Sequence, residues 1–96
     1  MRNAVTQRQR AVDLARSVRE IVAAAAQLRP SEIRLRSSIL DLGIDSMGLV
    51  VIAAEIQATH HLELSDRELM KLFKATKVVD IVLLLRSKCA AERRAT

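Results

Sequence analysis

Apolar residues recur at helical spacing in several segments of the chain. In the first segment they form one stripe of an amphipathic helix: Leu14, Val18, Ile21, Val22, Ala25 and Leu28. Pro30 disfavours helical geometry in the residue before it, so we expect this helix to end at Arg29. Residues 31–45 then show no sustained period, which predicts a long ordered loop. We expect its apolar residues to attach it to the core: Ile33, Leu35, Ile39, Leu40, Leu42 and Ile44.

Two further helices are marked by capping residues. The first should run from residue 46 to about residue 60, with Asp45 as its N-cap. Ser65 stands three residues before Glu68, which is the spacing of a capping box. This spacing predicts a short helix over residues 66–72.

A last helix is predicted over residues 76–88, where Val78, Val79, Val82, Leu83 and Leu85 provide the apolar positions. The β-branched run at 77–82 would also suit a strand. We prefer a helix, because no other segment offers a strand for it to pair with. The polar ends of the chain, 1–8 and 90–96, are expected to be frayed.

Length and composition favour one small helical domain. The 96 residues are enough for a single domain, residues 1–96, with a core expected over about 10–88. Two glycines and one proline leave little material for turns, which argues against a β-sandwich or barrel. We therefore predict an all-α fold, a small four-helix bundle with three longer helices and a short third one.

The net charge of +5 is unevenly distributed along the sequence. Residues 1–36 carry +5, residues 37–70 carry −5, and residues 71–96 carry +5. A basic protein can bind nucleic acid through such basic segments, and this remains one functional hypothesis. Against it, Phe73 is the single aromatic residue, so stacking on bases is almost unavailable.

The remaining reactive side chains give weak signals. Cys89 is the sole cysteine, so no intrachain disulfide can form, and a reducing, cytoplasmic environment is expected. Adjacent histidines point in different directions on a helix, so His60 and His61 are read as structural residues. No cluster has metal-ligand spacing and no nucleophile-base set stands out, so we expect neither a metal site nor an enzyme.

The chemically informative stretch is residues 40–47, Leu-Asp-Leu-Gly-Ile-Asp-Ser-Met. It places the hydroxyl of Ser46 in the first turn of a helix, directly after Asp45 and a loop that contains Gly43. The N-terminus of a helix presents unpaired N–H groups and a partial positive charge. A phosphodiester on Ser46 would therefore be stabilised there.

This stretch resembles the signature of the acyl carrier protein family, with Met47 where leucine is commonest. The resemblance extends from about Val18 to Leu85 in the order and lengths of the helices. It implies that a phosphopantetheinyl transferase attaches 4′-phosphopantetheine to Ser46 and that the thiol of this group holds an acyl or aminoacyl thioester. The implied partners are an acyl-loading ligase or acyltransferase and a ketosynthase or other acyl-using enzyme of fatty acid, polyketide or related biosynthesis.

The predicted second helix departs from the family, where it is usually rich in acidic residues. Here Glu55 is its one acidic residue. Its apolar residues form two stripes: Leu49, Ala53, Ile56 and His60 on one side, and Met47, Val51, Ala54 and Ala58 on the other. We expect the first stripe in the core and the second to meet partners by apolar contact, with Asp41, Asp45 and Glu55 as a charged rim. Residues 1–12 or a second copy of the chain could instead cover the second stripe, although a monomer is expected.

Two hypotheses compete with the carrier. One is the basic module that binds nucleic acid through residues 1–36 or 71–96. The other is a scaffold that keeps the carrier fold without being modified at Ser46. Addition of one phosphopantetheinyl group to the chain would separate the carrier from both.

Overall fold

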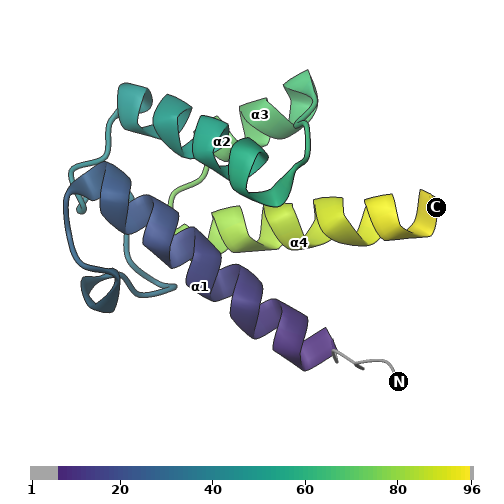
Figure 1. Cartoon of the computed structure of the whole chain (residues 1–96). Coiled ribbons are helices and arrows are strands. Elements are labelled where there is room, and N and C mark those ends of the chain that lie inside the picture. Colours follow the sequence, from purple (N-terminus) through teal and green to yellow (C-terminus); the bar gives the residue numbers. More distant parts are fainter. Residues whose placement is uncertain (1–6, 96) are drawn as a thin grey trace.

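The described part of the chain folds into four α-helices and one short 3-10 turn (Figure 1). The computed structural model describes residues 7–95, without the side chains of residues 7–9, 11 and 92–95. In chain order the elements are α1 (Gln7–Ala26), η1 (Pro30–Glu32), α2 (Ser46–His60), α3 (Asp66–Phe73) and α4 (Val78–Ala95). Helix α1 packs on α2 and α4, and α3 packs on the same two helices. The all-α fold with a short third helix is thus confirmed.

A single apolar core holds the helices together. Every helix contributes to it, and so does the loop before α2. The most deeply buried side chains are Val18, Val22, Ile33, Ile52, Ile56, Leu72, Val78, Ile81 and Leu85. Within the described part of the chain no polar or charged side chain is buried, so burial of apolar surface is the main source of stability.

Helix α1 ends at Ala26, three residues before the predicted end at Arg29. The cause is Gln27, which adopts the left-handed conformation with φ 60°. The N–H of Leu28 donates to the carbonyl of Ala23 at 2.9 Å, and the N–H of Gln27 donates to that of Ala24. These two bonds form a Schellman motif, which satisfies the last carbonyls of the helix before the proline is reached.

The loop between α1 and α2 is attached to the core by fewer residues than predicted. Ile33, Ile39 and Ile44 are buried, as expected. The same expectation is wrong for Leu40, which is 81% exposed, and for Leu35, which is 39% exposed. Backbone hydrogen bonds attach this part of the loop to the rest of the fold instead.

Three backbone hydrogen bonds join this loop to the start of α4. The N–H of Ile39 donates to the carbonyl of Thr76 at 2.9 Å. In the opposite direction, the N–H groups of Val78 and Val79 donate to carbonyls of residues 37 and 35 at 3.1 and 2.8 Å. The strand considered for residues 77–82 is therefore reduced to one isolated bridge, between Ser38 and Lys77.

Helix α4 begins two residues after the predicted start at residue 76, and it extends beyond the predicted end at residue 88. It begins at Val78 because Asp80 accepts hydrogen bonds from the backbone N–H groups of Thr76 and Lys77, both at 3.0 Å, and caps the helix. It continues to Ala95, so the segment expected to be a frayed tail from residue 90 is helical up to that point. At the other end, Gln7 and Arg8 belong to α1, while residues 1–6 lie outside the described residues.

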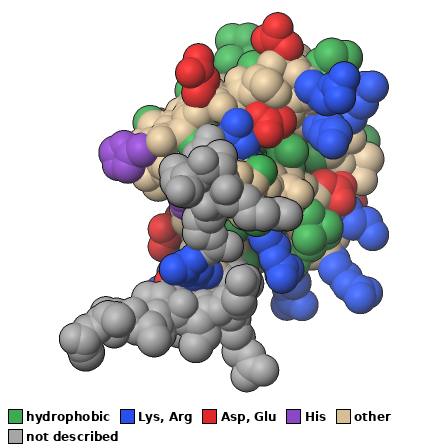
Figure 2. Space-filling view, turned by 90° about the vertical axis from the view of Figure 1, so that its right-hand side faces the viewer, with side chains coloured by type: hydrophobic (Ala, Val, Ile, Leu, Met, Phe, Trp, Pro, Cys, Tyr) green, Lys and Arg blue, Asp and Glu red, His purple; other side chains and the backbone are tan. Residues whose placement is uncertain are grey.

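Basic and acidic side chains share the surface. Figure 2 shows most Lys and Arg side chains on the right and along the lower edge of the face that it presents, with Asp and Glu side chains among them. No helix in the described part of the chain is long and apolar enough to cross a membrane.

Candidate functional site

Ser46 is the first residue of α2, and its side chain is exposed. Asp45 precedes it in an extended conformation, and its carboxylate oxygen Oδ1 accepts a hydrogen bond from the N–H of Gly48 at 2.9 Å. The predicted N-cap is therefore confirmed. The remaining N–H groups of the first turn give this end of α2 a partial positive charge beside the Ser46 hydroxyl.

Gly43 turns the chain into this position. Its φ of +80° lies in the left-handed region, where glycine carries no steric penalty. The N–H of Gly43 donates to the carbonyl of Leu40 at 3.0 Å, and that of Ile44 donates to the carbonyl of Ile39 at 3.3 Å. The turn thereby buries Ile44 and brings Asp45 to the head of α2.

Gly48 is needed in the first turn of α2 because space is short. A Cβ atom at this position would lie 2.9 Å from Cγ2 of Ile44 and 3.5 Å from Oδ1 of Asp45. Ile44 is 5% exposed and belongs to the core, so its methyl group has little room to move. This role of Gly48 could not be predicted from the sequence, because it depends on the backbone conformation that places the side chain of Ile44 against the first turn of α2.

A groove of about 410 Å³ opens beside Ser46. One wall comes from the loop and the start of α2, and the other comes from the turn between α3 and α4. The residues that line it are Ser38, Ile39, Leu40, Ile44, Asp45, Ser46, Leu49, Ala75 and Thr76. An exposed hydroxyl at the edge of a mainly apolar groove suits a long flexible group attached to the oxygen and lying against the protein.

Helix α2 buries one stripe and exposes the other, as predicted. Leu49, Ala53 and Ile56 belong to the core, and so does Ile52, which is not part of the predicted stripe. On the opposite side Met47 is 70% exposed and Val51 is 50% exposed. The outer stripe is completed by Val50, Ala54 and Ala58, which are also exposed.

A second groove, of about 370 Å³, lies between α1 and α2. Val51 and Glu55 contribute to it from α2. From α1 it is lined by Glu20, Ile21, Ala24 and Ala25. The outer stripe of α2 therefore borders a hollow with an apolar floor and two carboxylates.

The three carboxylates predicted as a rim do not form one cluster. Asp45 lies at the groove beside Ser46, and Glu55 lies at the groove between α1 and α2. Asp41 lines neither groove; its side chain is exposed, and its backbone N–H donates to Oγ of Ser38 at 3.3 Å. Each carboxylate thus has its own surroundings.

His60 connects α2 to α1. Its Nε2 atom lies 2.9 Å from Oγ of Ser17, and the contact is partly buried. Burial lowers the pKa of His60, and His61 lowers it further. His61 is exposed and ends α2 in the left-handed conformation. In residues 7–95 no group of three or more His, Cys, Asp or Glu side chains could hold a metal ion, and Cys89 is partly buried.

Comparison with known proteins identifies the family. The family model described as a phosphopantetheine attachment site matches residues 16–84, a range that contains Ser46 and both grooves. Comparison with curated proteins gives no match. In this family 4′-phosphopantetheine is attached covalently to a serine, and it is therefore the cofactor of this chain. The chain belongs to the phosphopantetheine attachment site family, the carrier proteins that its sequence resembles.

Proposed function

We propose that Ser46 is the serine that carries 4′-phosphopantetheine and that the chain is a non-catalytic acyl carrier protein of the cytoplasm. The observation that carries the proposal is the position of Ser46, exposed at the head of α2 and at the edge of the apolar groove. The cargo is an acyl or aminoacyl intermediate of fatty acid, polyketide or related biosynthesis. A phosphopantetheinyl transferase, an acyl-loading ligase or acyltransferase, and a ketosynthase or similar enzyme are the partners.

The chain's own residues position and shelter the modified serine. Once attached, phosphopantetheine supplies the thiol that holds an acyl group as a thioester. The free N–H groups at the start of α2 stabilise the negative charge of a phosphodiester on Ser46. Asp45 keeps that first turn ordered, because its carboxylate is engaged by the N–H of Gly48. Leu40 and Leu49 in the groove exclude water from whatever lies against them.

Modification of the purified chain tests the assignment of Ser46. The chain is incubated with coenzyme A and a broad-range phosphopantetheinyl transferase, and its intact mass is measured. We expect the mass of one phosphopantetheinyl group to be added to the wild type and to Ser38→Ala, whose hydroxyl lies at the same groove. We expect no addition to Ser46→Ala. An unmodified wild type would favour the scaffold, and with salt-dependent nucleic-acid binding it would favour the basic module.

We propose further that partner enzymes dock on the outer stripe of α2. Val51 lies about 7 Å along the helix from Ser46, and half of its side chain is exposed. Apolar side chains that stay exposed beside a modification site are typical of interaction surfaces. The apolar stripe takes the docking role that acidic residues of this helix have in the family, because Glu55 is the one acidic residue of α2.

Substitution of the stripe tests this docking surface. Val51→Asp should slow modification of Ser46 at least about tenfold, which corresponds to about 1.4 kcal/mol of lost binding. Leu83→Asp is the matched control, since it adds the same charge at an apolar side chain that is 52% exposed on α4, outside the stripe. Equal modification rates for the two variants and the wild type would contradict docking through the stripe.

A further inference from the structure

Helix α3 and the residues that follow it present an exposed surface in which cations lie beside two large apolar side chains. We refer to it as the basic α3 face: Arg67, Met70, Lys71, Phe73, Lys74 and Lys77. Arg67, Lys71 and Lys74 follow one another at offsets of four and three, so they share one side of the helix. Met70 is 57% exposed beside them, and Phe73, the single aromatic residue of the chain, is 44% exposed.

The cations of this face are available to a partner. In residues 7–95 no carboxylate lies within 4.0 Å of the charged nitrogens of Arg67, Lys71 or Lys74. Lys77 lies near Asp80, but the carboxylate of Asp80 already accepts hydrogen bonds from Thr76 and from the backbone N–H of Lys77. Of the two acids of α3, Glu68 is paired with Lys88, and Asp66 lies one turn before Met70, on the edge of the face away from Lys71.

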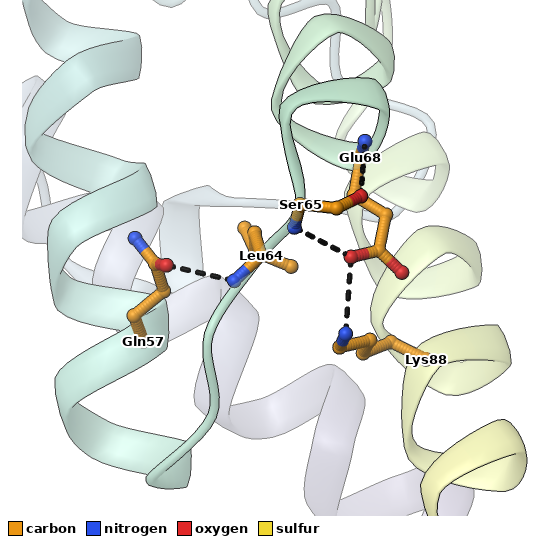
Figure 3. Close-up of polar contacts among 5 residues, drawn as sticks. All are labelled: Gln57, Leu64, Ser65, Glu68 and Lys88. Carbon is orange, nitrogen blue, oxygen red and sulfur yellow. Dashed lines mark hydrogen bonds and ion pairs between the residues drawn. The ribbon is translucent and has the colours of Figure 1, made fainter.

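The face is held rigidly on the rest of the molecule (Figure 3). Oε1 of Glu68 accepts a hydrogen bond from the N–H of Ser65 at 2.8 Å and an ion pair from Nζ of Lys88 on α4 at 3.1 Å. Just before the helix, the N–H of Leu64 donates to Oε1 of Gln57 on α2 at 2.8 Å. A surface that is already ordered loses little conformational entropy when a partner binds.

The basic α3 face also continues into the site at Ser46. Residues 75 and 76, which directly follow Lys74 and precede Lys77, form one wall of the groove beside Ser46. A protein bound to this face would therefore border the groove. Asp45 lies on the opposite side of the same groove, so a carboxylate faces the wall formed by Ala75 and Thr76, the two residues between Lys74 and Lys77.

From this arrangement we infer that the basic α3 face docks a protein partner whose surface carries Glu and Asp beside an apolar centre. The carboxylates pair with the cations of α3, and the apolar centre contacts Met70 and Phe73. Large apolar side chains inside a polar rim are the usual anchors of protein interfaces. A nucleic acid offers phosphates but no apolar complement to Met70, and Asp45 would repel it. The inference rests on the proposed function, because it names the chemistry of a partner that reaches Ser46.

A defined probe tests the inference. The probe is a synthetic amphipathic helical peptide with Leu and Phe along one stripe and Glu on both sides of it. Its dissociation constant is measured by fluorescence anisotropy against the wild-type chain. We expect Lys71→Glu combined with Lys74→Glu to raise that constant at least about tenfold. Arg10→Glu combined with Arg16→Glu is the control, because it makes the same charge change on α1, which does not contact α3. It should leave the constant within about twofold.

Two further measurements make the result decisive. A second peptide with Lys in place of Glu should bind the Lys71→Glu and Lys74→Glu variant more tightly than the wild type. An equal loss of binding in the α1 control would overturn the inference, and so would tighter binding of a DNA oligonucleotide or of vesicles with anionic lipid than of the acidic peptide. The intact-mass measurement on the same samples tests the proposed function separately. A chain that binds the peptide but is never modified contradicts that function alone.

Discussion

Gly43 and Gly48 lie on either side of Ser46 and are required for different reasons. Gly43 holds a left-handed backbone conformation with open space around it, so a side chain there would meet strain and no clash. Gly48 has ordinary helical geometry, but the space for a side chain is taken by Ile44. The first requirement can be guessed from a glycine in a loop, whereas the second contradicts the rule that alanine is preferred to glycine inside a helix.

Gly48→Ala should therefore destabilise the protein. The gain in helix propensity of about 1 kcal/mol is outweighed by a packing cost of about 2 kcal/mol against Ile44. We expect the free energy of unfolding, measured in urea, to fall by about 1 kcal/mol. Ala54→Gly, at an exposed site of the same helix, measures the difference in helix propensity between alanine and glycine without the contact with Ile44. A rise in stability for Gly48→Ala would show that the contact with Ile44 is not limiting.

At the scale of the elements, the starts of α2 and α3 were the most predictable features. Asp45 and Ser65 cap α2 and α3 at the residues that their sequence spacing indicated, because a cap is a local interaction. The end of α1 was predicted three residues too late, because it depends on the left-handed conformation of Gln27. Glutamine, unlike glycine, does not indicate this conformation in a sequence. The groove at Ser46 was not predictable, since residues 75 and 76 reach it through the folding of α4 against the loop.

The Ser65 capping box joins α3 to α4 through one carboxylate. The N–H of Ser65 and Nζ of Lys88 both bind Oε1 of Glu68, and the N–H of Ser65 is the main cause of the lowered pKa of Glu68. Glu68→Ala should lower the free energy of unfolding by about 1 kcal/mol in a urea titration. Glu63→Ala removes an exposed carboxylate nearby and should change it by less than about 0.5 kcal/mol. Equal effects of the two substitutions would contradict this role of Glu68.

The contact between Ser17 and His60 makes the packing of α1 on α2 sensitive to pH. Burial lowers the pKa of His60 in the folded state below the value of about 6.5 expected when unfolded. Between these two values the unfolded chain binds more protons, so the free energy of unfolding falls as the pH decreases. We expect this fall to begin below about pH 6.5 and to be smaller in His60→Gln. Urea titrations from about pH 8 to pH 5 measure the free energy of unfolding. An identical pH dependence in His60→Gln would contradict this role of His60.

At the scale of the whole molecule, the net charge of +5 hides a division of the surface. Residues 37–70, which contain Ser46, carry a net negative charge, while the cations gather from Lys71 to Lys77 and on the segments at the two ends of the sequence. The sequence indicated this alternation along the chain. It did not indicate that the fold would bring Ala75 and Thr76, the residues between Lys74 and Lys77, to the groove beside Ser46, because the other residues of the groove belong to another segment.

The outer stripe of α2 should leave the molecule a monomer. If the stripe serves enzymes that visit Ser46, no second copy of the chain should cover it. Light scattering after size-exclusion chromatography should give a mass of about 10.7 kDa for the wild type and for Val51→Asp. A dimer that Val51→Asp dissociates would show that the stripe is a self-association surface, and would remove it as the docking site.

The backbone hydrogen bonds between the loop and the start of α4 bear on when the protein can be modified. A ribosome releases Ser46 well before it releases residues 76–79, whose hydrogen bonds hold the loop in place. Since domains fold as units, the nascent chain has no finished groove at Ser46 until α4 begins to form. Attachment of the prosthetic group should therefore follow synthesis of nearly the whole domain, and chains stalled before α4 should escape it.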